Sequence, residues 1–174
     1  MEANEHVYDG LSREQLVELL TMDAKNWLAM DGVWFQSVEG KFGMDEAMIH
    51  DTEAWRRFTV IEARRIRQFL NLPEAPGLDG MEKALPLRLA ARTNCYEILR
   101  QDGKLIYRVL DCRVQSARKR KGMELHPCKS VGCVEYEGFA KAIDPRITCR
   151  CLSCYPEITD ETCACGWVFT LENA

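Results

Sequence analysis

The chain has 174 residues, of which 47% are hydrophobic and 29% are charged, and its formal net charge is −4 at pH 7. This composition is typical of a folded globular protein and excludes a disordered tail. The net negative charge gives no general reason to expect nucleic-acid binding, and no apolar run approaches the roughly 20 residues of a membrane helix. A chain of this length predicts a single domain, 1–174.

The first ten residues are acidic and polar. We therefore expect a flexible segment at 1–10, no signal peptide and a cytoplasmic protein. Thiols stay reduced in the cytoplasm, so the nine cysteines are expected to be metal ligands or reactive groups rather than disulfides.

Three helices are predicted in the next segment, 11–92, which forms a helical half. Ser12 followed by Gln15 has the spacing of a capping box, so the first helix should start there. Its apolar positions run to about Met30, and the pair Asp31-Gly32 should end it.

The second helix should run from Met44 to about Leu70, with apolar residues on one broad face and arginines on the other. A third helix is predicted over 80–92, where Pro86 would kink or restart it.

The remaining segment, 93–174, is rich in cysteine, and its sequence pattern is typical of β-strands. Strands are predicted at 94–100 and 105–112, joined through Asp102-Gly103, a pair that favours a tight hairpin. A helix at 130–142 and two strands at 146–152 and 165–171 should follow. The fold class is therefore α+β, with N-terminal helices packed on a small antiparallel sheet in the order strand-strand-helix-strand-strand.

Between the two strand pairs, the segment 114–123 should be helical or irregular. It contains the basic run Arg118-Lys119-Arg120-Lys121. A solvated surface segment is the simpler interpretation, and contact with a phosphate or an anionic partner is the alternative.

Five cysteines fall within seventeen residues near the C-terminus. Thiolates bind zinc tetrahedrally, so two close pairs brought together by a hairpin would form a four-thiolate site. If the last two strands are antiparallel neighbours, alternate residues of each strand would place four sulfurs on one face and leave one spare. These candidate ligands are Cys149, Cys151, Cys154, Cys163 and Cys165.

A second, looser group consists of Cys112, Cys128 and Cys133, with His126 beside it. Cys112, Cys128 and one C-terminal cysteine would form an open site with water in the fourth position, as catalytic zinc requires. Iron–sulfur ligation also uses thiolates, so an iron–sulfur cluster, reduced thiols without metal and redox disulfides stay open. Cys95 is interpreted as a small hydrophobe.

The N-terminal half carries aromatic and acidic residues near the predicted joint of the first two helices. Trp27, Trp34 and Trp55 should lie close together there, either as a packed core or as a ligand pocket. In the second case Asp31, His50 or Asp51 would be its polar groups. His50 is either a general base or a surface residue. The chain has no Gly-rich phosphate loop, no Gly-x-Ser-x-Gly elbow and no His-Glu-x-x-His motif.

Several stretches resemble a family of uncharacterised bacterial and archaeal cytosolic proteins of similar length. The resemblance lies in Asp31-Gly-Val-Trp-Phe, Trp55, Glu62-Ala-Arg-Arg, Cys112-Arg-Val-Gln, Asp144-Pro-Arg and the Cys-x-x-Cys-x-Pro that follows. That family implies no activity.

The C-terminal half also resembles 4-vinyl reductase domains and L-2-amino-thiazoline-4-carboxylic acid hydrolase-like proteins. The shared features are the hairpin, the helix with Cys133 and Glu135, and the strand beginning Cys165-Gly-Trp-Val-Phe. This resemblance implies a small-molecule-binding module in which Cys133 and Cys165 bind metal.

The leading hypothesis is a zinc-binding ligand-binding or sensory domain, whose pocket takes a small apolar or aromatic molecule. A partner or homodimer formation would read out binding, and neither a membrane nor a nucleic acid is expected. One alternative is a hydrolase of a small C–N or thioester bond, acting through zinc-bound water or through a cysteine activated by His126. The other is a structural or redox cysteine protein.

Overall fold

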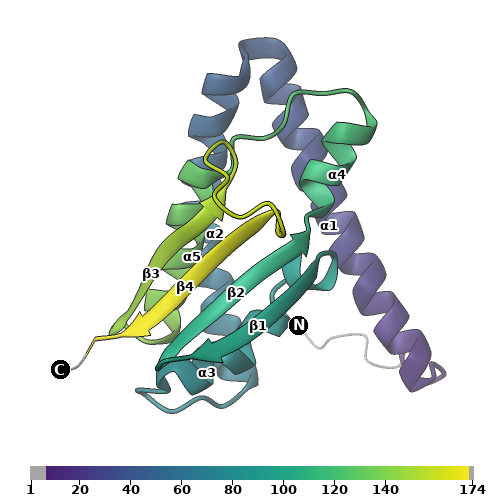
Figure 1. The fold of residues 1–174 in the computed structure, drawn as a ribbon. Helices are drawn as coiled ribbons and strands as arrows, with labels where there is room; N and C mark the ends of the chain where they lie inside the picture. Colours follow the sequence, from purple (N-terminus) through teal and green to yellow (C-terminus); the bar gives the residue numbers. More distant parts are fainter. Residues whose placement is uncertain (1–6, 173–174) are drawn as a thin grey trace.

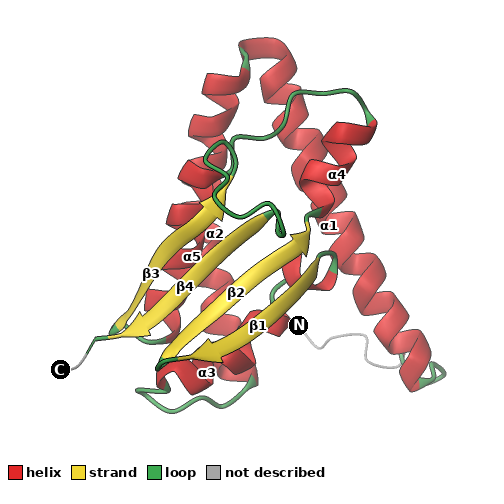
Figure 2. Cartoon of the chain, viewed as in Figure 1, coloured by secondary structure: helices red, strands yellow, loops and turns green. Residues whose placement is uncertain are grey.

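Helices fill the first half of the chain, and in the second half two helices lie between two pairs of strands in the sequence (Figure 2). The computed structural model describes residues 7–172. The predicted α+β class is confirmed: four antiparallel strands form a sheet, and α2 (Met44–Phe69) and α5 (Lys129–Ile143) lie behind it (Figure 1). Residues 1–6 of the segment predicted to be flexible lie outside the described residues.

The first helix, α1 (Arg13–Phe42), is longer than predicted. The capping box of Ser12 and Gln15 is confirmed, but the expected end at Asp31-Gly32 is wrong. A glycine inside a helix costs only about 1 kcal/mol, and Phe35 beyond it is buried, so packing keeps the chain helical. The helix ends instead at Gly43, whose φ of 92° is readily adopted only by glycine.

The next helices follow the predictions in part. α2 begins and ends within one residue of the predicted bounds. The predicted helix over 80–92 is wrong, because only α3 (Gly77–Ala84) is α-helical and two short 3-10 turns follow, Leu85–Leu87 and Ala90–Arg92. Pro86 lies in the first of these turns; it has no backbone N–H and cannot continue the hydrogen-bond ladder of a helix.

The sheet contains β1 (Cys95–Gln101), β2 (Lys104–Asp111), β3 (Ile147–Cys154) and β4 (Cys165–Leu171) in the spatial order β1-β2-β4-β3. The predicted hairpin is confirmed: Asp102 and Gly103 have φ angles of 50° and 72°, as a tight two-residue turn requires. β4, the last strand, lies in the centre and pairs with β2 and β3.

One face of the sheet packs on the helices. β2 and β4 direct alternate side chains to that face, and these pack against aromatic and aliphatic residues of α5. Tyr136 of α5 stacks on Trp167 of β4 with ring centroids 4.5 Å apart. The α5 backbone approaches this indole closely, since a Cβ at Gly132 would lie 2.7 Å from it.

Two further elements complete the fold. The short helix α4 (Arg113–Arg120) follows β2, where the sequence left a helix or an irregular segment open, and lies near α1 in Figure 1. No helix within residues 7–172 is both long enough and apolar enough to cross a membrane.

A buried arginine links the helices on this face of the sheet. The Arg88 side chain, only 2% exposed, donates to Glu62 of α2 at 3.0 Å and to Glu135 of α5 at 2.5 Å. Its guanidinium also lies over the rings of Tyr136 and Phe139. Burial opposes the charged form, but the two carboxylates raise the pKa of Arg88 above its usual range, so the residue stays charged.

We predict that Arg88→Met lowers the free energy of unfolding by about 3–5 kcal/mol, because it leaves two buried carboxylates without their cation. Arg100 is the matched control: it pairs with Asp79 and Glu82 but is 41% exposed. Arg100→Met should cost less than about 1 kcal/mol. Urea denaturation followed by circular dichroism measures both, and equal losses would contradict the role given to Arg88.

Candidate functional site

A cavity of about 450 Å³ lies where the helices meet one end of the sheet. Its walls come from α1, α2, α4, α5 and the ends of β2, β3 and β4. This volume is in the range of small-molecule sites. The cavity has aromatic walls and polar groups, which include Trp27, Asp31, Phe35, Asp51, Trp55, Cys112, His126, Cys128, Glu135, Tyr136, Cys154, Cys165 and Trp167.

His126 lies between a carboxylate and a thiol in this cavity. Its Nδ1 is 3.0 Å from the Cys128 sulfur, and its Nε2 is 3.1 Å from Oδ2 of Asp51. The side chains of His126 and Asp51 are only 10% and 9% exposed. Phe35 packs against the imidazole with ring centroids 4.6 Å apart. Two segments distant in sequence, one with Asp51 and one with His126 and Cys128, therefore form a Cys-His-Asp arrangement.

The partners of His126 assign its protons. A carboxylate only accepts hydrogen bonds, so Nε2 carries the proton that Asp51 accepts. Nδ1 is then free to accept the thiol proton of Cys128. Burial, with the nearby thiols of Cys112 and Cys165, raises the pKa of Cys128 well above its usual range, so its sulfur is a neutral thiol at rest.

Gln115 of α4 holds this pair in place. Its side-chain amide donates to the His126 carbonyl at 2.7 Å and accepts from the His126 backbone N–H at 3.1 Å. These two bonds define which end of the amide carries hydrogen. The Nε2 of Gln115 also lies 3.1 Å from the Cys128 sulfur and donates to it.

Cys128 occupies the N-cap position of α5, but its side chain does not cap the helix. The sulfur contacts His126 and Gln115 instead. A helix N-terminus carries partial positive charge and favours a negative charge on a nearby sulfur. The position would therefore stabilise a negative charge on the Cys128 sulfur.

Three further thiols line the same cavity. Cys112 follows β2, Cys154 ends β3 and Cys165 begins β4, where Cys154 and Cys165 are directly paired. Burial raises the pKa of Cys112 to about 11. The indole Nε1 of Trp167 donates to the Cys165 sulfur at 3.3 Å.

The other cysteines lie elsewhere. β3 and β4 are antiparallel neighbours, but Cys149 and Cys151 pair with Phe169 and Trp167, and a register shift follows Cys151. The pattern predicted four sulfurs on one face, with Cys149 and Cys151 beside Cys163 and Cys165. In the structure Cys149, Cys151, Cys154 and Cys165 are on the helix-facing side of the sheet, and Cys163 is not. Cys133, Cys149 and Cys151 lie near one another outside the cavity, and burial raises the pKa of all three thiols. Cys95 is exposed, and all nine thiols are free.

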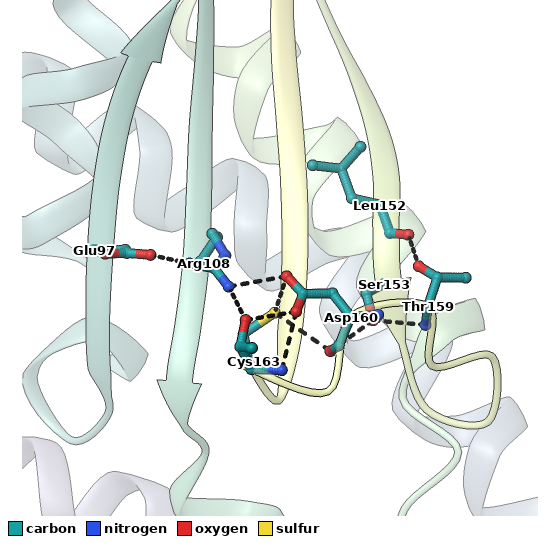
Figure 3. A network of polar contacts seen from close by, with 8 residues as sticks. Glu97, Arg108, Leu152, Ser153, Thr159, Asp160 and Cys163 are labelled. Carbon is teal, nitrogen blue, oxygen red and sulfur yellow. Dashed lines mark hydrogen bonds and ion pairs between the residues drawn. The ribbon is translucent and has the colours of Figure 1, made fainter.

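Cys163 lies on the other side of the sheet, in a polar network that secures the loop between β3 and β4 (Figure 3). Arg108 of β2 binds Glu97, Thr162 and Asp160, the last at 2.9 Å. The Thr162 hydroxyl and backbone amide, with Arg108, hold the pKa of Asp160 well below its usual range.

The Ser153 hydroxyl extends this network by accepting from the backbone N–H groups of Thr159 and Asp160, both at 3.1 Å. The network joins the loop to β2 and β3, and so defines where Cys154 and Cys165 leave the sheet.

No group of three or more His, Cys, Asp or Glu side chains in residues 7–172 is arranged to hold a metal ion. The cavity thiols are suitable donors, but zinc would require the sulfurs to move together. The predictions of zinc and of an iron–sulfur cluster stay predictions.

The predicted N-terminal pocket residues separate into two sets. Trp27, Asp31 and Trp55 line the cavity, and the two indoles make an edge-to-face contact at 5.7 Å. Trp34 is 65% exposed and lies outside it. His50 also lies outside, with a side chain 60% exposed and 3.4 Å from Glu46.

The sequence interpretation did not identify the contact of Gln115 with Cys128 or that of Trp167 with Cys165. A glutamine on a short polar helix carries no signal of its own. The pairing of Asp51 with His126 spans 75 positions, and no local pattern records it. The spacing His126-Pro127-Cys128 was the one local signal that a histidine and a thiol would be neighbours.

Comparison with known protein families identifies the family of this chain. Residues 9–171 match the family described as "Family of unknown function (DUF6125)", and the chain belongs to that family. No curated protein and no solved structure matches the chain. The comparisons do not link it to 4-vinyl reductase domains or to L-2-amino-thiazoline-4-carboxylic acid hydrolase-like proteins, so that resemblance stays a prediction.

Asp31 makes the stability of the fold depend on pH. Burial and the neighbouring Asp51 raise its pKa to about 6, against the opposing effect of His126. The folded protein therefore binds a proton that the unfolded chain releases near pH 4, and the associated stability is lost as the pH rises through 6. We predict that Asp31→Asn raises the free energy of unfolding by roughly 1–3 kcal/mol near pH 7 and by much less near pH 4.

Urea denaturation at both pH values measures this difference. Asp23→Asn is the control, because Asp23 is exposed on the same helix, and it should change stability little at either pH. A variant Asp31→Asn no more stable than the parent at neutral pH would show that the carboxyl is not buried as described.

Proposed function

We propose that this protein is an enzyme that uses Cys128 as a nucleophile to hydrolyse or transfer the acyl group of a small thioester or C–N substrate. The proposal rests on one observation, the position of the His126 ring between the Asp51 carboxylate and the Cys128 sulfur. A nucleophile, a base within hydrogen-bond reach and a third group that orients the base are the recurring parts of nucleophilic acyl transfer.

The reaction follows from the proton positions. Nδ1 of His126 takes the thiol proton as the sulfur attacks the substrate carbonyl, and Asp51 stabilises the resulting imidazolium. The imidazolium then gives its proton to the leaving thiol or amine as the bond to it breaks, which leaves an acyl group on Cys128. In hydrolysis, a water loses its proton to Nδ1 and attacks the thioester, and the acid departs as the thiol is restored.

The surroundings of the thiol support this assignment. Because burial raises the pKa of Cys128, a free thiolate is scarce at neutral pH and attack requires a base. His126 is the base within reach, and its other nitrogen is already held by Asp51. Gln115 donates to the sulfur and stabilises the negative charge that forms on it. The resemblance of the C-terminal half to hydrolase-like proteins is consistent with this class of reaction.

The first prediction is covalent. Incubation with p-nitrophenyl acetate should release nitrophenol in a burst and leave one acetyl group on the peptide that contains Cys128, detected by mass spectrometry. Cys128→Ala should lose both the burst and the acetyl group. Cys95→Ala is the matched control, since Cys95 is exposed and lies outside the cavity, and it should react like the parent. An acetyl group spread over other side chains, or a normal burst in Cys128→Ala, would refute the proposal.

His126→Gln tests the base separately from the nucleophile. The acylation rate at neutral pH should fall by about 10²–10⁴-fold, which is the usual contribution of a general base. The loss should shrink as the pH rises, because hydroxide then ionises the thiol directly. His50→Gln is the control, because His50 is exposed, and its rate should equal that of the parent.

A second candidate function is the zinc-binding ligand-binding domain, and a separate observation favours it. Four of the nine cysteines, Cys112, Cys128, Cys154 and Cys165, line one cavity. Thiolates are preferred zinc ligands. This candidate requires the four sulfurs to converge when metal binds, whereas the thiol enzyme requires no rearrangement.

Metal analysis of freshly purified, reduced protein separates the two candidates. About one equivalent of zinc that Cys165→Ser removes and Cys95→Ser retains would support the metal site. Iron with sulfide and visible absorption would identify an iron–sulfur cluster instead. Metal-free protein that is acetylated at Cys128 would support the thiol enzyme. Protein that neither binds metal nor is acetylated would favour the structural or redox interpretation.

A further inference from the structure

The cavity has a basic side that the proposed reaction does not use. Five cationic side chains line it together with the thiol and imidazole, namely Lys25 of α1, Arg113, Arg118 and Arg120 of α4, and Lys121 just beyond α4. Arg113, Arg120 and Lys121 are exposed rather than buried in the core. The basic run noted in the sequence therefore lies at the cavity and is not only a solvated surface segment.

The positions of these side chains along α4 place them on the helix face that lines the cavity. Lining positions fall at 113, 114, 117, 118, 120 and 121, which is the spacing of one face of a helix and its continuation. Lys119 belongs to the same run but does not line the cavity. Three members of the run, Arg118, Arg120 and Lys121, therefore line the cavity, and Lys119 does not.

Four of these five cations have no carboxylate of their own in the described part of the chain. The buried member of the run, Arg118, is bound by Glu39 in two hydrogen bonds of 2.9 and 2.5 Å. By contrast, Lys25, Arg113, Arg120 and Lys121 form no ion pair within residues 7–172.

Two of the three carboxylates that line the cavity have a partner. Asp51 faces His126, and Glu135 is bound by Arg88. The pKa of Asp31 is raised to about 6, so this carboxyl is the one of the three that stays charged without an ion-pair partner near pH 7 within residues 7–172. The cavity lining therefore carries more positive than negative charge, and it also includes Trp27, Trp55 and Trp167.

We propose that the cavity binds a small anion with an aromatic or apolar body, whose carboxylate or phosphate is held by Arg113, Arg120 and Lys121. The tryptophans would bury the body of the molecule, and arginine matches both anions through two parallel hydrogen bonds. Cys128 and these three cations line the same cavity. If the proposed function holds, the substrate is thus an acyl compound that also carries an anionic group.

The test measures binding and does not depend on acylation. Isothermal titration compares 3-phenylpropionate and phenyl phosphate with the neutral amide 3-phenylpropanamide, on the full chain. We expect both anions to bind about ten-fold more tightly than the amide, as charge-assisted hydrogen bonds would give. The double variant Arg120→Ala/Lys121→Ala should lose this preference and keep its affinity for the amide.

Lys119→Ala is the matched control, because it removes one charge from the same run on the side away from the cavity. It should keep the preference for anions, and thermal melting confirms that each variant folds. Tighter binding of one of the two anions identifies whether carboxylate or phosphate is the natural group. Equal affinity for amide and anions, no binding of any probe, or an equal loss in Lys119→Ala would overturn the proposal. Acetylation of Cys128 by the neutral ester reports on the proposed function alone, so the two proposals fail separately.

Discussion

The buried charge of Arg88 is the constraint on which the rest of this structure depends. An arginine removed from water must have partners, and here the partners lie on two helices far apart in sequence, Glu62 on α2 and Glu135 on α5. Glu62 also accepts from the backbone N–H of Leu89 at 2.7 Å. The interaction therefore joins α2, the turns after α3 and α5 in one relative position.

That position decides where the Cys128 thiol lies. Glu135 is two turns of helix beyond Cys128 on α5, so holding Glu135 also holds the start of the helix and its thiol. On the other side, α2 carries both Glu62 and Asp51. The same pair of helices thus sets the distance between the thiol and the carboxylate, and the His126 ring fills the space between them.

Much of the fold was predictable because its signals are local. The amphipathic pattern of α2, the Asp-Gly turn and the apolar last strand each depend on neighbouring residues, and all three agree with the structure. The errors have the opposite cause. Asp31-Gly32 has the local pattern of a helix end, but contacts of the following turn with other elements keep α1 helical, and Phe35 is buried against His126.

The cysteines show the same division. All nine thiols are free, and Cys112 and Cys128 line one cavity with the C-terminal Cys154 and Cys165. The strand pattern, however, grouped Cys149, Cys151, Cys163 and Cys165. A register shift after Cys151 places Cys154 opposite Cys165 instead, and such a shift depends on the pairing of two strands rather than on either strand alone.

The sequence by itself determined the α+β class, the order of the elements and the concentration of thiols in the second half of the chain, because these follow from periodicity and composition. Only the tertiary structure decided which side chains share the cavity. Asp51 meets His126 and Cys128 in the cavity from a distant part of the chain, and their meeting depends on helix packing and on the buried ion pairs of Arg88. Contacts of that kind leave no periodic trace in a single sequence.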